Sequence, residues 1–405
     1  MAAVTTHLES QDPIDDTDTS CEIQPDGTLG ARACVPPIES QHNGLVKTLW
    51  IRRSLEDVLA QKRYAIMDGN SLAASGLSLI DTGDDDVDAA KTPSLKKRTK
   101  LYIVLDKPLM QYDIPWMVGA QVEAQTFSLI GSNSKMKCPT WDLPAGATMT
   151  GGSCPGATPG QTTVPHAERV KAANRVHLQV RIQETICGLC YATGGQYASP
   201  HVQGGEILRF WWTKELMQTG RSAEWVATMK RAFEGETWAR ERLPDPRPQF
   251  AHRAVLPVRV HSSGDFFSVE YAKAWIDLCN QLPELLFWAP TRTWASPGWN
   301  EIWAGLLPQL QHQNLILRPS AYHTNEAAPV PESHPWPGGF PYTADGSASF
   351  YKFVQPGPHD FEFQCGTYAA EKGSKNCLSA RAPDGHVGCR ACWVHPTLSI
   401  NYTSH

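Results

Sequence analysis

The stretch "AVLPVRVHSSGDFFSVEYAKAWIDLCNQLPELLFWAP", residues 254–290, decides the fold. Its first seven residues form an apolar run rich in valine, which predicts a buried strand over 254–260. Apolar side chains then recur with helical period over 269–282, and "ELLFWAP" at 284–290 predicts a second strand. A strand, a helix and a strand in this order are typical of a βα unit on a parallel sheet.

The same alternation continues on both sides of this stretch. Helical periods or short apolar runs occur in segments 101–109, 205–218, 222–243, 299–312 and 314–320. We therefore expect an α/β core over residues 131–330, built as a (β/α) barrel or a partial barrel of parallel strands.

The remaining segments differ from this core in composition. Residues 1–45 carry scattered acids, prolines and threonines without an apolar period, which predicts a disordered tail. Residues 46–130 form an N-terminal extension whose linker changes from acidic to basic between 81 and 100. Residues 331–405 are rich in glycine, proline, aromatic residues and cysteine, so we expect an irregular, metal-binding C-terminal extension.

Composition limits the class of protein. The 405 residues are 41% hydrophobic, which is enough for a substantial core, and the formal net charge is -5 with a pI near 6.3. The surface is therefore not basic all over, and any contact with nucleic acid must come from a local patch. The absence of an 18-residue apolar run and of a signal-peptide pattern predicts a cytoplasmic protein without a membrane partner.

The turn after the strand at 254–260 is the first candidate site. His261, Ser263, Gly264 and Asp265 follow this strand, and α/β folds bind their ligands at the carboxyl ends of parallel strands. Asp265 could serve as a general base, as a nucleophile or as a hydrogen-bond partner of a ligand, which Gly264 would allow to approach the backbone. Asp265 could also cap the next helix, but Ser268 lies closer to its start and is the better cap.

Two arginines follow the next two predicted strands. Arg292 lies in "PTRTW" and Arg318 in "LRPSAYH", and both could hold a phosphate or a carboxylate; an internal ion pair is the structural alternative. We assign catalytic roles to Asp265, His261 and Arg292, and cofactor or substrate binding to Ser263, Gly264 and Arg318.

Two groups of cysteines are candidate metal ligands, because paired cysteines in a reducing compartment more often bind metals than form disulfides. The three thiolates of the first group can hold a four-iron cluster, or a zinc ion if His201 or Cys138 supplies the fourth ligand. The four thiolates of the second group can close a zinc or iron–sulfur site. Buried thiols without a metal are the alternative for both groups. The first group is Cys154, Cys187 and Cys190, and the second is Cys365, Cys377, Cys389 and Cys392.

Five short motifs resemble a known family. "DLPAG...SCPGAT", "CGLCYA", "VRVHSSGDFFSVEYAKAW", "LFWAPTRTW" and "CRACW" occur here in the order found in the phage family named gene product 88. The resemblance covers roughly residues 140–395, and the family has no assigned reaction. Its cysteine pattern is similar to that of phage proteins related to radical S-adenosylmethionine enzymes, which implies a four-iron cluster on the first cysteine group and Asp265 near the bound methionine moiety. Here the 32-residue gap after Cys154 departs from that pattern.

We therefore expect a phage-type metalloenzyme that modifies a nucleic-acid base or a nucleotide, with an iron–sulfur cluster or zinc as cofactor and S-adenosylmethionine as a further candidate. A weaker resemblance to base-exchange transglycosylases implies a different enzyme, in which Asp265 is the nucleophile that inserts a 7-deazaguanine into DNA and zinc is structural. A third alternative is a zinc-stabilised nucleic-acid-binding protein without enzymatic activity, which would contact phosphate through the basic residues 96–100.

Overall fold

The structure is a computed structural model. It describes residues 56–57, 59–75, 100–109, 124–133, 138–146, 148, 152–157, 192, 197, 200–239, 242–245, 250–320, 363–364 and 400–401. The predicted disordered tail and the predicted acidic-to-basic linker up to residue 99 lie outside these ranges.

A parallel-rich sheet forms the centre of the described chain. Its strand order is β4-β5-β7-β8-β9, and β5 through β9 along this path are parallel, whereas β4 is antiparallel to β5, and β6 is antiparallel to β7. The strands are β4 (Gly131–Asn133), β5 (Cys138–Trp141), β6 (Leu243–Pro244), β7 (Ala254–Val260), β8 (Leu285–Thr291) and β9 (Leu315–Pro319).

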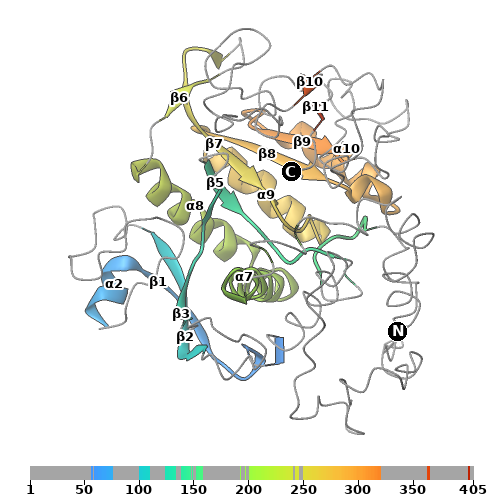
Figure 1. Ribbon diagram of the computed structural model, residues 1–405. Coiled ribbons are helices and arrows are strands. Elements are labelled where there is room, and N and C mark those ends of the chain that lie inside the picture. The colour runs from blue at the N-terminus through green and yellow to red at the C-terminus, as the bar shows by residue number, and fades with distance from the viewer. Residues whose placement is uncertain are drawn as a thin grey trace, which may run out of the picture.

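Four α-helices accompany this sheet (Figure 1). They are α7 (Pro200–Gln218), α8 (Ser222–Ala239), α9 (Val269–Gln281) and α10 (Trp299–Leu306). Short 3-10 turns, η7 (Thr293–Ala295) and η8 (Leu307–Gln309), flank α10.

A smaller antiparallel sheet packs on the far side of α7 and α8. Its order is β1-β2-β3, with β1 (Tyr64–Asp68), β2 (Leu101–Leu109) and β3 (Ala124–Ser128), and α2 (Gly69–Ala74) follows β1. Leu101, Ile103 and Leu105 of β2 join the main hydrophobic core, so α7 and α8 lie between the two sheets, as Figure 1 shows. The described segments end with the two-residue parallel strands β10 (Phe363–Gln364) and β11 (Ile400–Asn401).

The parallel sheet has two faces of different character. Alternate residues of its strands, such as Val258 and Phe287, share one hydrophobic core with residues of α7, α8, α9 and α10. The intervening residues Arg259, Trp288 and Arg318 are also buried but lie on the opposite face, because successive side chains of a strand point to opposite sides.

The predicted α/β class with parallel strands is confirmed, and so are the strand–helix–strand units from β7 to β9. A closed barrel is not found in the part of the chain that the structure describes, since β9 pairs only with β8 there and β4 ends the other side of the sheet. Closure would require these two edges to be joined by further strands.

Pro257 and Pro290 lie inside parallel strands without breaking the hydrogen-bond ladder. The N–H of Leu256 donates to the backbone carbonyl of Glu284, the residue before β8, so the nitrogen of Pro257 faces the other edge of β7. There it falls between the residues paired with β6 and those paired with β5, where no ladder bond is needed. Pro290 lies two residues beyond Trp288, the last residue of β8 paired with β7.

The Ser268 side chain caps α9, as its position predicted. Its Oγ accepts a hydrogen bond from the Tyr271 backbone N–H at 3.2 Å. We expect Ser268→Ala to lower the free energy of unfolding by about 1 kcal/mol, the usual cost of losing an N-cap. Chemical denaturation of the variant and of Ser268→Asp, which retains a capping oxygen, measures this cost; equal losses in both would contradict a capping role.

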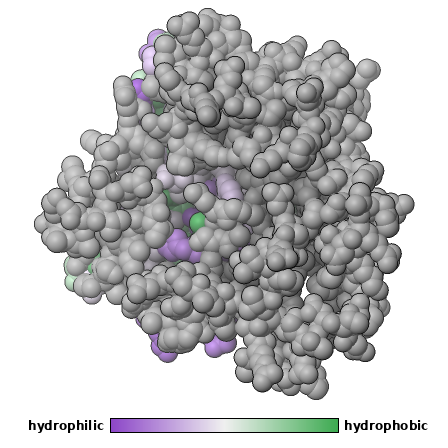
Figure 2. Space-filling view, in the orientation of Figure 1, coloured by the Kyte–Doolittle hydropathy of each residue, from purple (hydrophilic) through white to green (hydrophobic). Residues whose placement is uncertain are grey.

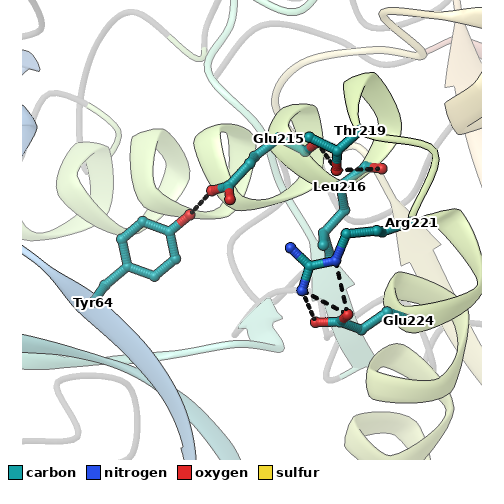
Figure 3. A network of polar contacts seen from close by, with 6 residues as sticks. All are labelled: Tyr64, Glu215, Leu216, Thr219, Arg221 and Glu224. Carbon is teal, nitrogen blue, oxygen red and sulfur yellow. Dashed lines mark hydrogen bonds and ion pairs between the residues drawn. The ribbon is translucent and has the colours of Figure 1, made fainter.

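The junction of α7 and α8 ties the small sheet to the helices (Figure 3). The Tyr64 hydroxyl donates to Glu215 Oε2 at 2.9 Å, which joins β1 to α7. At the end of α7, Arg221 N donates to Leu216 O and Gly220 N to Met217 O, the bonding pattern of a Schellman turn with glycine at its left-handed position. Arg221 then pairs with Glu224 in the first turn of α8.

No helix among the described residues is long and apolar enough to span a membrane.

Candidate functional site

The turn after β7 is fixed to the end of β5 by three hydrogen bonds. His261 N donates to Trp141 O at 2.7 Å, Ser262 N donates to Asp142 Oδ1 at 2.6 Å, and Leu143 N donates to Ser263 O at 2.9 Å. The carboxyl ends of the two neighbouring strands therefore form one rigid edge, where the sequence predicted a site.

The carboxylate of Asp265 is enclosed at this edge and is only 3% exposed. Its Oδ1 accepts hydrogen bonds from Phe266 N (2.8 Å) and from Thr291 Oγ1 (2.7 Å), while Oδ2 accepts one from Arg292 N (2.7 Å). Asp265 thus joins the turn after β7 to the end of β8.

A directional chain of hydrogen bonds ends on this carboxylate. Trp303 Nε1 on α10 donates to Thr293 Oγ1 at 2.8 Å. Because Thr291 gives its hydroxyl proton to Asp265, Thr293 must be the donor in the 2.9 Å contact between the two threonine hydroxyls. Every donor in the chain points toward Asp265, which favours the ionised carboxylate.

Burial opposes this effect and dominates it. Removal from water raises the pKa of Asp265 to about 6, although the hydrogen bonds from Arg292 N, Thr291 and Phe266 N and the charge of Arg292 lower it. A carboxyl group that titrates near 6 can accept or release a proton close to neutral pH, as a general acid or base must.

His261 faces the core beneath the edge. Its backbone has a positive φ of 63°, and its ring makes edge contacts with Phe266 and Trp275, while Nε2 lies 3.0 Å from the Tyr271 hydroxyl. That hydroxyl accepts from Trp141 Nε1, so its proton is available to His261 Nε2. Burial lowers the pKa of His261 to about 3, so the ring is neutral at physiological pH. This geometry suits a residue that positions the turn.

The turn containing Cys154 packs directly on the Asp265 turn. Ser153 is fully buried, and its Oγ donates to Pro144 O at 2.9 Å and accepts from Asp265 N at 3.1 Å. Gly264, at φ 84°, leaves no room for a side chain, since a Cβ there would overlap Ser153 and Leu143.

A second close approach fixes the other side of the same turn. A Cβ on Gly156 would overlap the backbone carbonyl of Arg292, and the Cys154 N–H donates to Gly146 O at 2.9 Å. The half-buried Cys154 is therefore held between the turns that follow β5, β7 and β8.

The other predicted binding residues also lie at or near this edge. Ser263 is 3% exposed, and its hydroxyl has no hydrogen-bond partner among the described residues. Arg292 is buried directly after β8, and Arg318 is 1% exposed near the end of β9. The structure thus brings Asp265, Ser263 and Arg292 to one edge with Cys154, whereas Arg318 lies on the face of the sheet opposite α9.

The remaining predicted metal ligands lie outside the described ranges: Cys187, Cys190, Cys365, Cys377, Cys389 and Cys392. Within those ranges no group of three or more His, Cys, Asp or Glu side chains could hold a metal ion. Cys138 is buried in β5, and His201 stacks on Phe127 at the start of α7.

Sequence reasoning missed the residues that brace the site. Asp142 accepts from Ser262 N and from Thr140 Oγ1, and Ser153 and Thr291 both bond Asp265. The motifs "DLPAG", "SCPGAT" and "PTRTW" contain these residues, but only the pairing of β7 with both β5 and β8 brings the three segments together. Described residues of both hydrophilic and hydrophobic type are visible near the middle of the face drawn in Figure 2.

The family model described as Gene product 88 matches residues 118–395, more than half of the chain, including every cysteine of the two groups and the whole Asp265 edge. The match begins after β1, α2 and β2. No curated protein and no solved structure matches the chain. The chain belongs to the Gene product 88 family.

Proposed function

We propose that this protein is a phage-type metalloenzyme that modifies a nucleotide or a nucleic-acid base at the carboxyl edge of its parallel sheet. Cys154, Cys187 and Cys190 would hold an iron–sulfur cluster, and Asp265 would act beside it. The observation that carries this proposal is the packing of the Cys154 turn on the Asp265 turn through Ser153 and Gly264.

The position of Cys154 fits a metal ligand. Its side chain is half-buried, and its backbone is fixed by the bond to Gly146 O and by the contact of Gly156 with Arg292 O. Such a fixed and partly accessible thiol can reach a metal without a change in the fold. An iron–sulfur cluster on three thiolates would supply redox chemistry and one iron open to an outside ligand.

The residues of the edge would support this chemistry in two ways. Asp265 can hold or release a proton on Oδ2, the oxygen that accepts only one hydrogen bond among the described residues, because its pKa lies near neutral pH. The backbone N–H of Arg292 donates to that oxygen, and the guanidinium group of the same residue could orient an anionic substrate group.

The transglycosylase alternative makes a different demand on Asp265. A nucleophilic carboxylate must present an oxygen to the sugar carbon, whereas this carboxylate is 3% exposed and accepts three hydrogen bonds. Of the basic residues invoked for the alternative of a nucleic-acid-binding protein, only Lys100 lies in the described ranges. Both alternatives remain hypotheses, and measuring the iron, sulfide and zinc content of the protein separates them from the proposal.

We expect the protein purified without oxygen to contain iron and sulfide with a broad visible absorption band, and Cys154→Ala to lose most of both. The measurement is iron, sulfide and zinc per chain for each variant. Cys279→Ala is the matched control, because Cys279 is a buried cysteine of α9 that faces the hydrophobic core. Zinc without iron, or iron retained in Cys154→Ala, would refute the cluster at this site.

A further inference from the structure

Helix α7 carries a line of buried polar side chains, although it lies between two sheets in the hydrophobic core. These residues are Gln203, Glu206, Arg209 and Thr213, and each is at most 7% exposed. Residues three or four positions apart lie on the same side of a helix, so the four side chains follow one another along α7. We call these four residues the α7 stripe. A buried polar group needs a hydrogen-bond partner, so each member of the stripe should have one.

Gln203 is the exception in the α7 stripe. Arg209 Nε donates to Asp142 O at 2.9 Å, and Thr213 Oγ1 accepts from Trp225 Nε1 at 3.1 Å. By contrast, neither Nε2 nor Oε1 of Gln203 has a hydrogen-bond partner among the described residues. An unpaired buried amide lowers stability, and native proteins pair such groups with protein, ordered water or a ligand. The Gln203 carboxamide is therefore a candidate ligand-binding group.

The first half of α7 lies against the turn that holds Asp265. The ring of Phe210 packs edge-on against that of Phe267, with 5.0 Å between the ring centres, and Phe267 is two residues after Asp265. Gln203 precedes Phe210 by seven residues, which is two turns of helix and about 10 Å, so it lies on the same side of α7 as Phe210. The unpaired carboxamide is therefore directed to the side of α7 that faces this turn.

The turn after β7 offers a second unpaired polar group. The hydroxyl of Ser263 has no hydrogen-bond partner among the described residues, while its backbone carbonyl is fixed by the bond from Leu143 N. A hydroxyl both donates and accepts, and a carboxamide has a donating nitrogen beside an accepting oxygen. Because Gln203 and Ser263 are uncharged, their free capacity suits a neutral ligand that both donates and accepts hydrogen bonds.

We infer that Gln203 binds the hydrogen-bonding edge of a nucleobase and determines which base is bound, with the Ser263 hydroxyl as a second contact. A carboxamide can pair with the donor and the acceptor of a base edge at the same time, as glutamine does with adenine. A serine hydroxyl can contact a donor or an acceptor. This inference rests on the proposed function and specifies how its substrate is recognised.

The chemistry of Gln203 favours a base over a phosphate. Phosphate oxygens accept hydrogen bonds, so a phosphate would leave Gln203 Oε1 unpaired, whereas a base edge can pair with both Nε2 and Oε1. Burial lowers the pKa of Arg209, and the negative charges of Asp142 and Glu206 raise it. Glu206 lies one turn after Gln203 on the same side of α7, so its charge would also repel a phosphate bound there.

Isothermal titration calorimetry of the full chain tests this inference. The probes are the four deoxynucleosides and deoxyribose 5-phosphate, which has no base. We expect at least one deoxynucleoside to bind at least tenfold more tightly than deoxyribose 5-phosphate. Equal binding of all probes, tighter binding of the sugar phosphate, or no binding of any probe would overturn it.

Gln203→Met separates a binding role from a structural one. This variant should weaken binding of the preferred deoxynucleoside at least tenfold and also raise the urea concentration at the midpoint of unfolding. The reason for the second effect is that methionine has a similar volume but no amide that the unliganded protein leaves unpaired. A lower midpoint, or unchanged binding, would contradict the inference.

Thr213→Val is the matched control on the same helix. Thr213 is a buried polar residue of the α7 stripe whose hydroxyl already has a partner in Trp225 Nε1. Its replacement should lower the midpoint of unfolding, because Trp225 Nε1 loses its acceptor, and should leave deoxynucleoside binding unchanged. A tenfold loss of binding in this variant would mean that binding follows the packing of α7 rather than the Gln203 carboxamide.

Gln203→Glu tests selectivity and decides the matter if Gln203→Met does not fold. Glutamate keeps the length of the side chain but only accepts hydrogen bonds when ionised, so the order of affinities among the four deoxynucleosides should change. An unchanged order would contradict the assignment to Gln203. Ser263→Ala should weaken binding of the preferred deoxynucleoside severalfold, and unchanged binding would contradict the second contact.

The two proposals fail separately. Deoxynucleoside binding that depends on Gln203, in a protein without iron, would support the base-binding role and contradict the cluster. Iron that depends on Cys154, in a protein that binds no deoxynucleoside, would support the cluster and contradict the base-binding role.

Discussion

Gly264→Ala is expected to lower the free energy of unfolding by about 3 kcal/mol. Gly264 has a φ of 84°, which costs an L-residue about 1 kcal/mol or more. The new Cβ would also overlap Ser153 Oγ and the backbone of Leu143, and such overpacking typically adds about 1–3 kcal/mol. Urea denaturation of wild type and variant measures the sum.

Gly220→Ala separates these two costs. Gly220 has a similar φ of 73°, but no atom lies within 4 Å of the Cβ that would be added there. Gly220→Ala should therefore lower the free energy of unfolding by only about 1 kcal/mol, the cost of the backbone conformation. Equal losses at positions 220 and 264 would mean that the Cys154 turn does not press on the Asp265 turn. A larger loss at 264, together with loss of bound metal, would link this contact to the proposed function.

The strands and helices from β7 to β9 could be predicted because their patterns are strong. The apolar runs at 254–260 and 284–290 and the helical period at 269–282 each depend on local sequence alone. The four residues of β5, "CPTW", contain a proline and show no alternation, so this strand was not predicted. It forms by pairing with β7, which is a tertiary contact.

The candidate site could be predicted in position but not in detail. The turn at 261–265 lies at the carboxyl edge because β7 is parallel to its neighbours. The inward direction of the His261 ring could not be predicted, since it depends on a left-handed backbone in a non-glycine residue and on contacts with Phe266 and Tyr271. The three hydrogen bonds of Asp265 likewise come from β8 and from its own turn only once the sheet has formed.

His261 and Asp265 should make opposite contributions to the pH dependence of stability. Burial lowers the pKa of His261 from 6.5 to about 3, so its contribution is present above pH 6.5 and is lost as the pH falls toward 3. Burial raises the pKa of Asp265 from 3.8 to about 6, so its contribution is present below pH 3.8 and is lost as the pH rises through 6. Each residue gives the free energy of unfolding a slope against pH of at most about 1.4 kcal/mol per pH unit. Between pH 4 and 6 the slopes of His261 and Asp265 have opposite signs and largely cancel.

Single substitutions should reveal each slope. Relative to wild type, Asp265→Asn should become less stable as the pH falls from 6 to 4, because only the His261 slope remains. His261→Asn should become more stable over the same interval, because only the Asp265 slope remains, and asparagine tolerates the left-handed backbone at this position. The measurement is the free energy of unfolding by urea at pH 4, 5 and 6, expressed as the difference from wild type so that groups common to both cancel.

Asp277→Asn is the matched control for this series. Asp277 is an exposed aspartate of α9, so its replacement removes a carboxylate without changing the buried edge. The difference in stability between this variant and wild type should change little between pH 4 and 6, and the double variant of His261 and Asp265 should behave in the same way. If Asp265→Asn follows wild type at every pH, the Asp265 carboxyl titrates as it does in water, and its role as an acid or base poised near neutral pH loses its physical basis.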